Sequence, residues 1–293
     1  MGWKEGIRMG QIARPQESDI DAWGLTHAGK VRTDNQDHFF LGALGRGVRV
    51  NRTSIGAKAR RVLHAERLAT LAMVADGVGG RSGGEEAARL AVQELVSSVS
   101  RSFHDADYAE ENDPEVFSRL LHEAALACHE SLLKKAEHEG AGRGFATTLT
   151  LFLGLWPHAY LLQVGDSRFY IYQDDELTQI SRDQTWAQDL VDDGTLTQTV
   201  AQGSKWANVL SSAMGGQNAE PVVTRFVRDW GAVILICTDG LTKHVSDELI
   251  EQRLSSMQNA RETAELLLQD ALDGGGTDNI TVITGRTVRP PEA

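Results

Sequence analysis

Aspartates at the ends of apolar runs are the residues of this 293-residue chain that could act together in chemistry. They stand where an apolar run meets a glycine or a small polar residue, at Asp76-Gly77, Asp166-Ser167, Asp239-Gly240 and Asp278-Asn279. A carboxylate is costly inside a protein core unless it is paired, hydrogen-bonded or bound to a metal ion. A single Asp-Gly pair is typical of a tight turn. Four such aspartates, each next to an apolar strand, could instead converge at one edge of a sheet.

Converging carboxylates repel each other unless cations neutralise them. Oxygen ligands favour hard divalent ions, Mn²⁺ or Mg²⁺, over zinc. Two interpretations of the aspartates therefore stay open, a centre for two such ions and a set of structural turns. Two other candidate sites are weaker. His122 and His129 lie about 10.5 Å apart along one helix, too far for a shared zinc ion, and the glycine-rich segment 77–84 completes neither nucleotide-binding glycine pattern.

Hydrophobic periodicity predicts the elements that must position these aspartates. The predicted strands begin at residue 22 and cover 38–44, 68–76, 147–156, 158–166, 168–173, 220–227, 232–239 and the end of the chain from about 277. The predicted helices cover 85–103, 114–139, 246–256 and 260–272. Strand groups alternating with helix pairs predict antiparallel sheets covered by helices in one α+β domain.

The composition is that of an ordinary globular protein, with 29 Lys+Arg against 41 Asp+Glu and a formal net charge of −12. This acidic balance argues against nucleic-acid binding, which needs clustered basic residues. The longest apolar stretches fall short of the ~18 residues that a membrane span needs, and the N-terminus lacks the apolar region of a signal peptide. Cys128 and Cys237 lie in apolar runs and favour a reducing compartment. We therefore expect a cytoplasmic protein with no membrane insertion.

Along the chain we expect a flexible leader at 1–20, a single domain at 21–288 and a tail at 289–293. The basic segment 45–67 is predicted to be an exposed excursion between two strands, with a docking surface as the alternative. Residues 181–218 are mostly polar and have only a weak helical pattern.

A series of short segments resembles the type-2C metal-dependent protein phosphatases (the PPM family), most closely its bacterial-type minimal domain. They occur in that family's order and are TDNQDHFF (33–40), MVADGVGGRSGGEEAA (73–88), GFATTLTLFL (144–153), QVGDSRFYIY (163–172), LICTDGL (235–241) and GTDNITVI (276–283). The resemblance implies a β-sandwich of two antiparallel sheets flanked by helices on both sides. It also implies a metal-dependent protein phosphatase that hydrolyses phosphoserine and phosphothreonine by direct attack of a metal-bridging water, without a phosphoenzyme.

The resemblance also assigns roles to individual residues. It implies that two ions, Mn²⁺ or Mg²⁺, are held by Asp76, the Gly77 carbonyl, Asp239 and Asp278, and that Asp166 helps to hold a third, weaker ion. Arg32 matches the arginine that holds the substrate phosphate, and Asp37 matches an acidic position near the water shell. Segment 181–218 matches the flap beside the site, which varies within the family and could select substrates. The implied partners are phosphorylated proteins made by a serine/threonine kinase, acted on by a monomer.

Three positions depart from the family pattern: Gln36 where glutamate is frequent, Val78 where histidine or methionine is frequent, and Arg81 in place of a histidine. None of them removes a metal-ligating carboxylate, so we expect an active enzyme. The alternatives are a noncatalytic module that binds a phosphoprotein, which intact metal aspartates argue against, and a metal-dependent nuclease or nucleotide phosphohydrolase. The net charge of −12 and the lack of a nucleotide-binding loop disfavour the latter.

Overall fold

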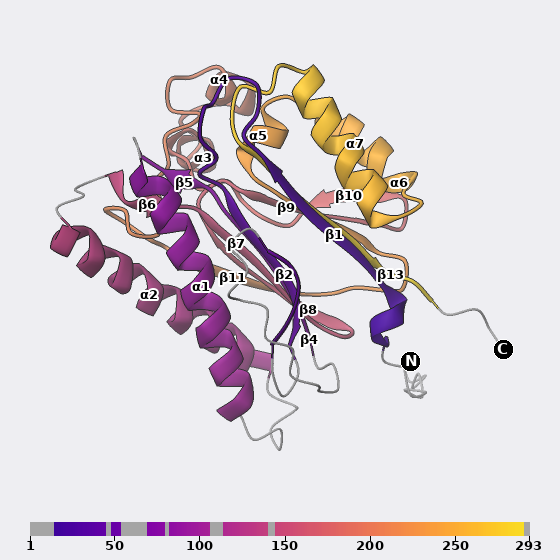
Figure 1. The fold of residues 1–293 in the computed structure, drawn as a ribbon. Coiled ribbons are helices and arrows are strands. Elements are labelled where there is room, and N and C mark those ends of the chain that lie inside the picture. Colours follow the sequence, from indigo (N-terminus) through magenta and orange to yellow (C-terminus); the bar gives the residue numbers. More distant parts are fainter. Residues whose placement is uncertain are drawn as a thin grey trace, which may run out of the picture.

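Two antiparallel sheets face each other in the computed structural model, and helices cover the outer face of each (Figure 1). The structure describes residues 15–44, 48–53, 69–79, 82–105, 114–139 and 144–289. The predicted α+β architecture, a β-sandwich flanked by helices on both sides, is therefore confirmed. In the described part of the chain, no helix is both long enough and apolar enough to cross a membrane.

The first sheet has five strands in the order β1-β13-β12-β9-β10. Their bounds are β1 (Ile20–His27), β13 (Ile280–Thr287), β12 (Val233–Cys237), β9 (Arg168–Gln173) and β10 (Glu176–Gln179). β12 is buried along its whole length, because the second sheet covers one of its faces and helices cover the other. Such a strand reads as a continuous apolar run rather than as an alternating one.

The second sheet has six strands in the order β11-β8-β7-β4-β2-β3. Their bounds are β11 (Val222–Val227), β8 (His158–Val164), β7 (Leu149–Leu155), β4 (Ala69–Ala75), β2 (His38–Leu44) and β3 (Val48–Thr53). A short ladder of β5 (Gly77–Val78) and β6 (Ala146–Thr147) continues beyond this sheet. The sequence analysis missed β3, an edge strand paired with β2 inside the basic segment. The rest of that segment, 45–47 and 54–67, lies outside the described residues.

Two long helices, α1 (Ser82–Asp105) and α2 (Pro114–Glu139), pack on the six-stranded sheet. Ala88, Ala91 and Leu95 of α1 are fully buried, as the helical periodicity predicts. The other sheet is covered by α5 (Asp239–Thr242), α6 (Asp247–Ser255) and α7 (Ala260–Asp273). The Asn259 side chain caps α7 by accepting a hydrogen bond from the Glu262 backbone N–H.

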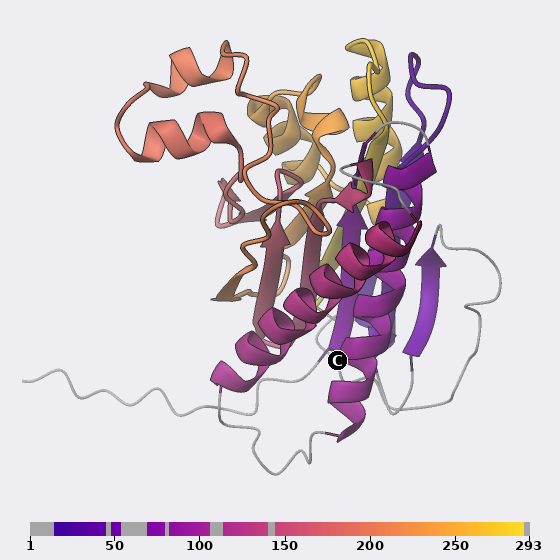
Figure 2. The same ribbon diagram turned by 90° about the vertical axis from the view of Figure 1, so that its left-hand side faces the viewer.

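The polar segment 181–218 forms two short helices, α3 (Trp186–Asp192) and α4 (Gln198–Gln202). They stand away from the sandwich, at the upper left of Figure 2. At the N-terminal end, the described chain begins with the 3₁₀ helix η1 (Glu17–Asp19), which leads directly into β1. Residues 1–14 of the predicted leader and residues 290–293 of the predicted tail lie outside the described residues.

Apolar side chains from both sheets fill the space between them. They include Phe39, Val74, Phe152, Phe169, Ile236 and Ile283. The rings of Phe152 and Phe169 stack with centroids 5.5 Å apart, so these two side chains join the sheets directly. The interior that supports the strand ends is therefore made of tightly packed apolar groups.

We expect Phe169→Ala to lower the free energy of unfolding by about 3–5 kcal/mol, because it leaves a cavity between the sheets. Urea denaturation followed by circular dichroism measures this change. Leu126→Ala on α2 is the matched control, since Leu126 is 39% exposed and its truncation opens no cavity. Equal losses in the two variants would contradict the assignment of Phe169 to the inter-sheet core.

Candidate active site

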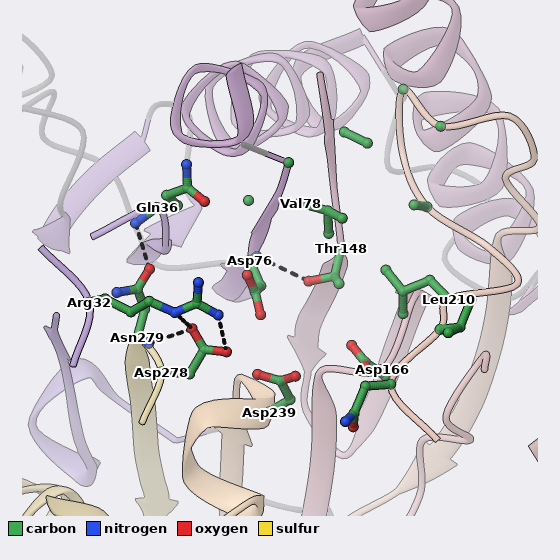
Figure 3. Close-up of a pocket in the computed structure, with 18 of the residues that line it drawn as sticks. Arg32, Gln36, Asp76, Val78, Thr148, Asp166, Leu210, Asp239, Asp278 and Asn279 are labelled. Atoms are coloured by element: carbon green, nitrogen blue, oxygen red, sulfur yellow. Dashed lines mark hydrogen bonds and ion pairs between the residues drawn. The ribbon is translucent and has the colours of Figure 1, made fainter. Parts of the chain in front are cut away.

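The strand-end aspartates meet in one cleft at an end of the sandwich. Asp76 follows β4, Asp166 follows β8, Asp239 follows β12, and Asp278 precedes β13. In Figure 3 their carboxylates face a common space, with Asp239 between Asp278 and Asp166 in this view. The cleft has a volume of about 1280 Å³. The convergence inferred from the sequence therefore occurs, although long stretches of chain separate the four residues.

Burial and repulsion from neighbouring carboxylates make Asp76 and Asp166 hard to ionise. Burial, reinforced by the negative charges of Asp37 and Asp239, raises the pKa of Asp76 well above its usual range. Burial and the neighbouring Asp239 raise the pKa of Asp166 to about 8. A cluster of this kind is stable in its ionised form only when cations lie within it.

Hydrogen bonds from Thr147, the last residue of β6, and from Thr148, which follows it, fix the backbone around Asp76. Its N–H donates to Thr148 Oγ1 at 3.0 Å, and its carbonyl accepts from the Thr148 N–H at 2.9 Å and from Thr147 Oγ1 at 2.8 Å. The hydroxyls of Thr148 and Ser167 share a hydrogen bond of 2.8 Å, which links Asp76 to the loop that carries Asp166. The two carboxylates are thus positioned by one polar network.

Gly77 lies where backbone segments come close together. A Cβ at this position would meet the backbone carbon and oxygen of Gly84 at 2.4 Å and the Gln36 carbonyl at 2.9 Å. Gly77 also pairs with Thr147 in the β5–β6 ladder. A side chain at position 77 would therefore push the start of α1 away from the backbone next to Asp76.

Asp37 lies behind the cleft rather than in its wall. It is 2% exposed, and its Oδ2 accepts hydrogen bonds from Thr238 Oγ1 at 2.8 Å and Thr281 Oγ1 at 2.7 Å. Burial raises the pKa of Asp37 to about 7, although these two hydrogen bonds act against the rise. Within the described part of the chain, Asp37 Oδ1 and Asp239 Oδ1 are buried and accept no hydrogen bond. Unsatisfied carboxylate oxygens beside a carboxylate cluster fit a site that takes divalent cations.

Two basic side chains contact the aspartates. Arg32 forms a forked pair with Asp278, from Nε to Oδ1 at 2.8 Å and from Nη2 to Oδ2 at 3.0 Å. Lys243 Nζ lies 2.6 Å from Asp239 Oδ2 and 2.8 Å from Asp278 Oδ2. Burial would raise the pKa of Asp278, but hydrogen bonds from Lys243 and Arg32 outweigh it and lower that pKa. Among the described residues, no three acidic, histidine or cysteine side chains surround a single metal position.

Asn279 anchors the loop that carries Arg32. Its Oδ1 accepts from the Gln36 N–H at 2.9 Å, and its Nδ2 donates to the carbonyls of Asp34 at 2.8 Å and Ala28 at 3.1 Å. The sequence analysis assigned no role to Asn279 or Lys243, although both line the cleft and contact its other residues. The i,i+4 spacing of Asp239 and Lys243 was a usable signal for the lysine, whereas the contacts of Asn279 cross more than 240 residues of sequence.

The residues singled out in the sequence mostly share this cleft. Its walls include Arg32, Gln36, Asp76, Gly77, Val78, Asp166, Asp239 and Asp278. The segment after α4, including Asn208–Leu210 and Gly215–Gln217, forms the opposite wall, where Figure 3 labels Leu210. Arg81 lies outside the described residues. His129 on α2 accepts a hydrogen bond from the Gly215 N–H at 3.0 Å, so it supports this wall.

The sequence profile of the Protein phosphatase 2C family matches residues 59–274. The chain therefore belongs to this family, as its motifs indicate.

Two solved structures and one curated relative illustrate the likeness. The serine/threonine protein phosphatase PstP of Mycobacterium tuberculosis (strain H37Rv) is 34% identical over 222 residues, 75% of this chain and 41% of that protein, so the chain spans about two fifths of this relative's length. The crystal structure of the M. tuberculosis phosphatase PstP/Ppp has a TM-score of 0.72 at 29% identity, covering 92% of this chain and 99% of that one. The PstP catalytic domain in complex with two manganese ions has a TM-score of 0.69 at 30% identity, with the same two coverages.

We expect Gly77→Ala to lower the free energy of unfolding by at least about 1–3 kcal/mol, the usual cost of forcing a group into a packed site. The reason is the 2.4 Å approach of the new Cβ to the Gly84 backbone. Urea denaturation of metal-free protein measures the effect without reference to any ligand. Gly203→Ala is the control, because a Cβ there would come no closer than 4.0 Å to the Val200 carbonyl. A Gly77→Ala variant as stable as Gly203→Ala would show that this approach is not a real constraint.

Proposed function

We propose that this chain is a metal-dependent protein phosphatase that removes phosphate from phosphoserine and phosphothreonine in proteins by direct attack of water, without a phosphoenzyme. The observation that carries the proposal is the convergence of Asp76, Asp239 and Asp278 in one cleft with Arg32 at its edge (Figure 3). Membership of the Protein phosphatase 2C family and the name of the PstP relative support it.

The oxygen-only ligand set suits two hard divalent ions, Mn²⁺ or Mg²⁺. We assign them to Asp76, the Gly77 carbonyl, Asp239 and Asp278, with Asp166 placed to help hold a third, weaker ion. When bound, such ions supply an activated water and neutralise charge on the phosphoryl oxygens. The unsatisfied buried Asp239 Oδ1 and the two manganese ions of the PstP structure support this assignment.

Arg32 is suited to bind the substrate phosphate. Its side chain is 57% exposed, and its guanidinium group binds both carboxylate oxygens of Asp278. Two oxygens of a phosphoryl group can accept the same two N–H bonds that the carboxylate accepts. A guanidinium makes this paired contact better than an ammonium does. We therefore assign Arg32 to phosphate binding, and Asp37 to orienting groups behind the ions from its buried position.

The lining of the cleft supports attack by water. No histidine or cysteine is found among the described residues that line it, and Val78 cannot donate a proton. The Thr148 hydroxyl is engaged with Ser167 and with the Asp76 N–H. These contacts leave the Thr148 hydroxyl in a structural role, and the Thr33 hydroxyl, which also lines the cleft, donates to Asp34 Oδ2 at 3.1 Å.

The remaining proposals concern the setting of the protein. We place the phosphatase domain at 21–288, with a leader at 1–20 and a tail at 289–293, in a cytoplasmic monomer. The free, buried thiols of Cys128 and Cys237 support a reducing compartment. The partners we propose are phosphorylated proteins made by a serine/threonine kinase, and not nucleic acids, because the net charge is −12. The flap that ends at the cleft wall is the element we propose to select among such proteins.

The purified protein should release phosphate from phosphothreonine peptides with Mn²⁺ and stop when a chelator is added. Asp76→Asn and Asp239→Asn should each lower kcat by at least ~10²-fold, because each removes an anionic ligand. Asp174→Asn is the control, since Asp174 lies in the exposed turn between β9 and β10. Turnover that persists in metal-free protein would reject the metal-dependent mechanism.

Arg32→Ala should lower kcat/KM for phosphopeptides by about 10²-fold, the loss expected for a charge-assisted phosphate contact. Arg32→Lys should recover only part of this loss, because lysine lacks the fork. Steady-state kinetics at saturating Mn²⁺ measures both variants. Arg261→Ala is the matched control, since this exposed arginine pairs with Glu265 on α7. Weaker Mn²⁺ binding in Arg32→Ala would make Arg32 a structural part of the metal site instead.

A further inference from the structure

The ammonium group of Lys243 lies between two carboxylates that we assign to metal binding. Nζ is 2.6 Å from Asp239 Oδ2 and 2.8 Å from Asp278 Oδ2, and the side chain is only 28% exposed. The lysine also opposes the rise in the pKa of Asp166 that burial and Asp239 cause. Its positive charge therefore acts on three of the four converging aspartates.

Local and long-range structure together hold Lys243 in this place. Helix α5 begins at Asp239, and the Lys243 N–H donates to the Asp239 carbonyl at 2.9 Å. Lys243 therefore lies one helical turn after Asp239, on the same side of the helix. Asp278 is brought to the same point because β13 pairs with β12. A flexible lysine on the protein surface would not be confined to two partners in this way.

An ammonium and a divalent cation cannot occupy the same carboxylate oxygens. An ion that binds through Asp239 Oδ2 and Asp278 Oδ2 must displace Lys243 from both oxygens. At Asp278 Oδ2 it must also replace the contact with Arg32 Nη2. Lys243 also remains nearby as a positive charge, which repels an incoming cation. In the metal-free protein the same charge offsets the repulsion between the two aspartates.

We propose that Lys243 is a tethered counter-cation of the metal centre, which competes with the divalent ions for Asp239 and Asp278 and so weakens their binding. This rests on the metal site assigned under the proposed function. It predicts opposite effects of removing the charge: the metal-free protein becomes less stable, and its affinity for metal becomes higher. A residue with a purely structural role would lower stability without tightening metal binding.

The test is a calorimetric titration of metal-stripped protein with Mn²⁺ alone, without substrate. Lys243→Met keeps most of the side chain's length and removes its charge, so it should bind Mn²⁺ at least about ten-fold more tightly, the effect of one nearby unit charge in a partly solvated site. Lys243→Arg keeps the charge and should stay within a few-fold of the wild-type affinity. Lys134→Met is the matched control, because Lys134 is 79% exposed on α2.

Thermal unfolding of the same proteins gives the second measurement. Without metal, Lys243→Met should have a lower Tm than both the wild type and Lys134→Met, and Mn²⁺ should raise its Tm by more than it raises theirs. If Lys243→Met does not fold without metal, Lys243→Gln is used, since its amide can still donate a hydrogen bond to a carboxylate without carrying charge.

The outcomes separate this proposal from the function on which it rests. If the wild type binds Mn²⁺ and the variants without the charge bind it equally or more weakly, the role proposed for Lys243 is wrong but the metal site stands. Absence of Mn²⁺ binding in the wild type and in every variant overturns the metal site, and the counter-cation with it. Tighter binding confined to the variants that lack the charge supports the proposal.

Discussion

Repulsion among carboxylates gathered at one end of an apolar sandwich is the constraint on which the rest of this structure depends. Asp37, Asp76 and Asp166 all lie where burial raises the pKa of an acid, and neighbouring carboxylates raise it further. Such a cluster is costly unless cations offset it. The protein supplies two of its own, Arg32 and Lys243, and leaves carboxylate oxygens that suit divalent ions.

The sandwich tolerates this cost because the rest of its interior is apolar and well packed. Phe152 and Phe169 join the two sheets, and β4 and β12 are buried from end to end. Strands held in this way cannot relax to separate their terminal aspartates. The hydrogen bonds of Thr148 and Asn279 then fix the loops that follow the strands. Rigid support of this kind keeps charged groups close together before any ligand arrives.

The opposite wall of the cleft is built differently. A backbone bridge between Thr147 and Met214 and the bond from the Gly215 N–H to His129 attach its base to the sandwich. Beyond this base, α3 and α4 project away from the sheets (Figure 2). The exposed Trp186 begins α3, and the exposed Trp206 lies in the turn after α4. The aspartates are thus held by strands of both sheets, whereas the flap (181–218) is attached to the sandwich at its base. Its outer surface can therefore vary without moving the aspartates.

The sequence by itself determined the features that depend on local pattern: the α+β class, the bounds of α2 at Pro114 and Glu139, and the aspartates that end the apolar runs. It did so because periodicity, capping and turn preferences act over a few residues. Only the tertiary structure decided which carboxylate oxygens already contact a basic side chain. The β12–β13 register brings Asp239 and Asp278 to one ammonium, and the 28–36 loop folds back onto Asn279. These contacts join residues far apart in the chain, so their geometry follows from sheet pairing and packing rather than from any local spacing.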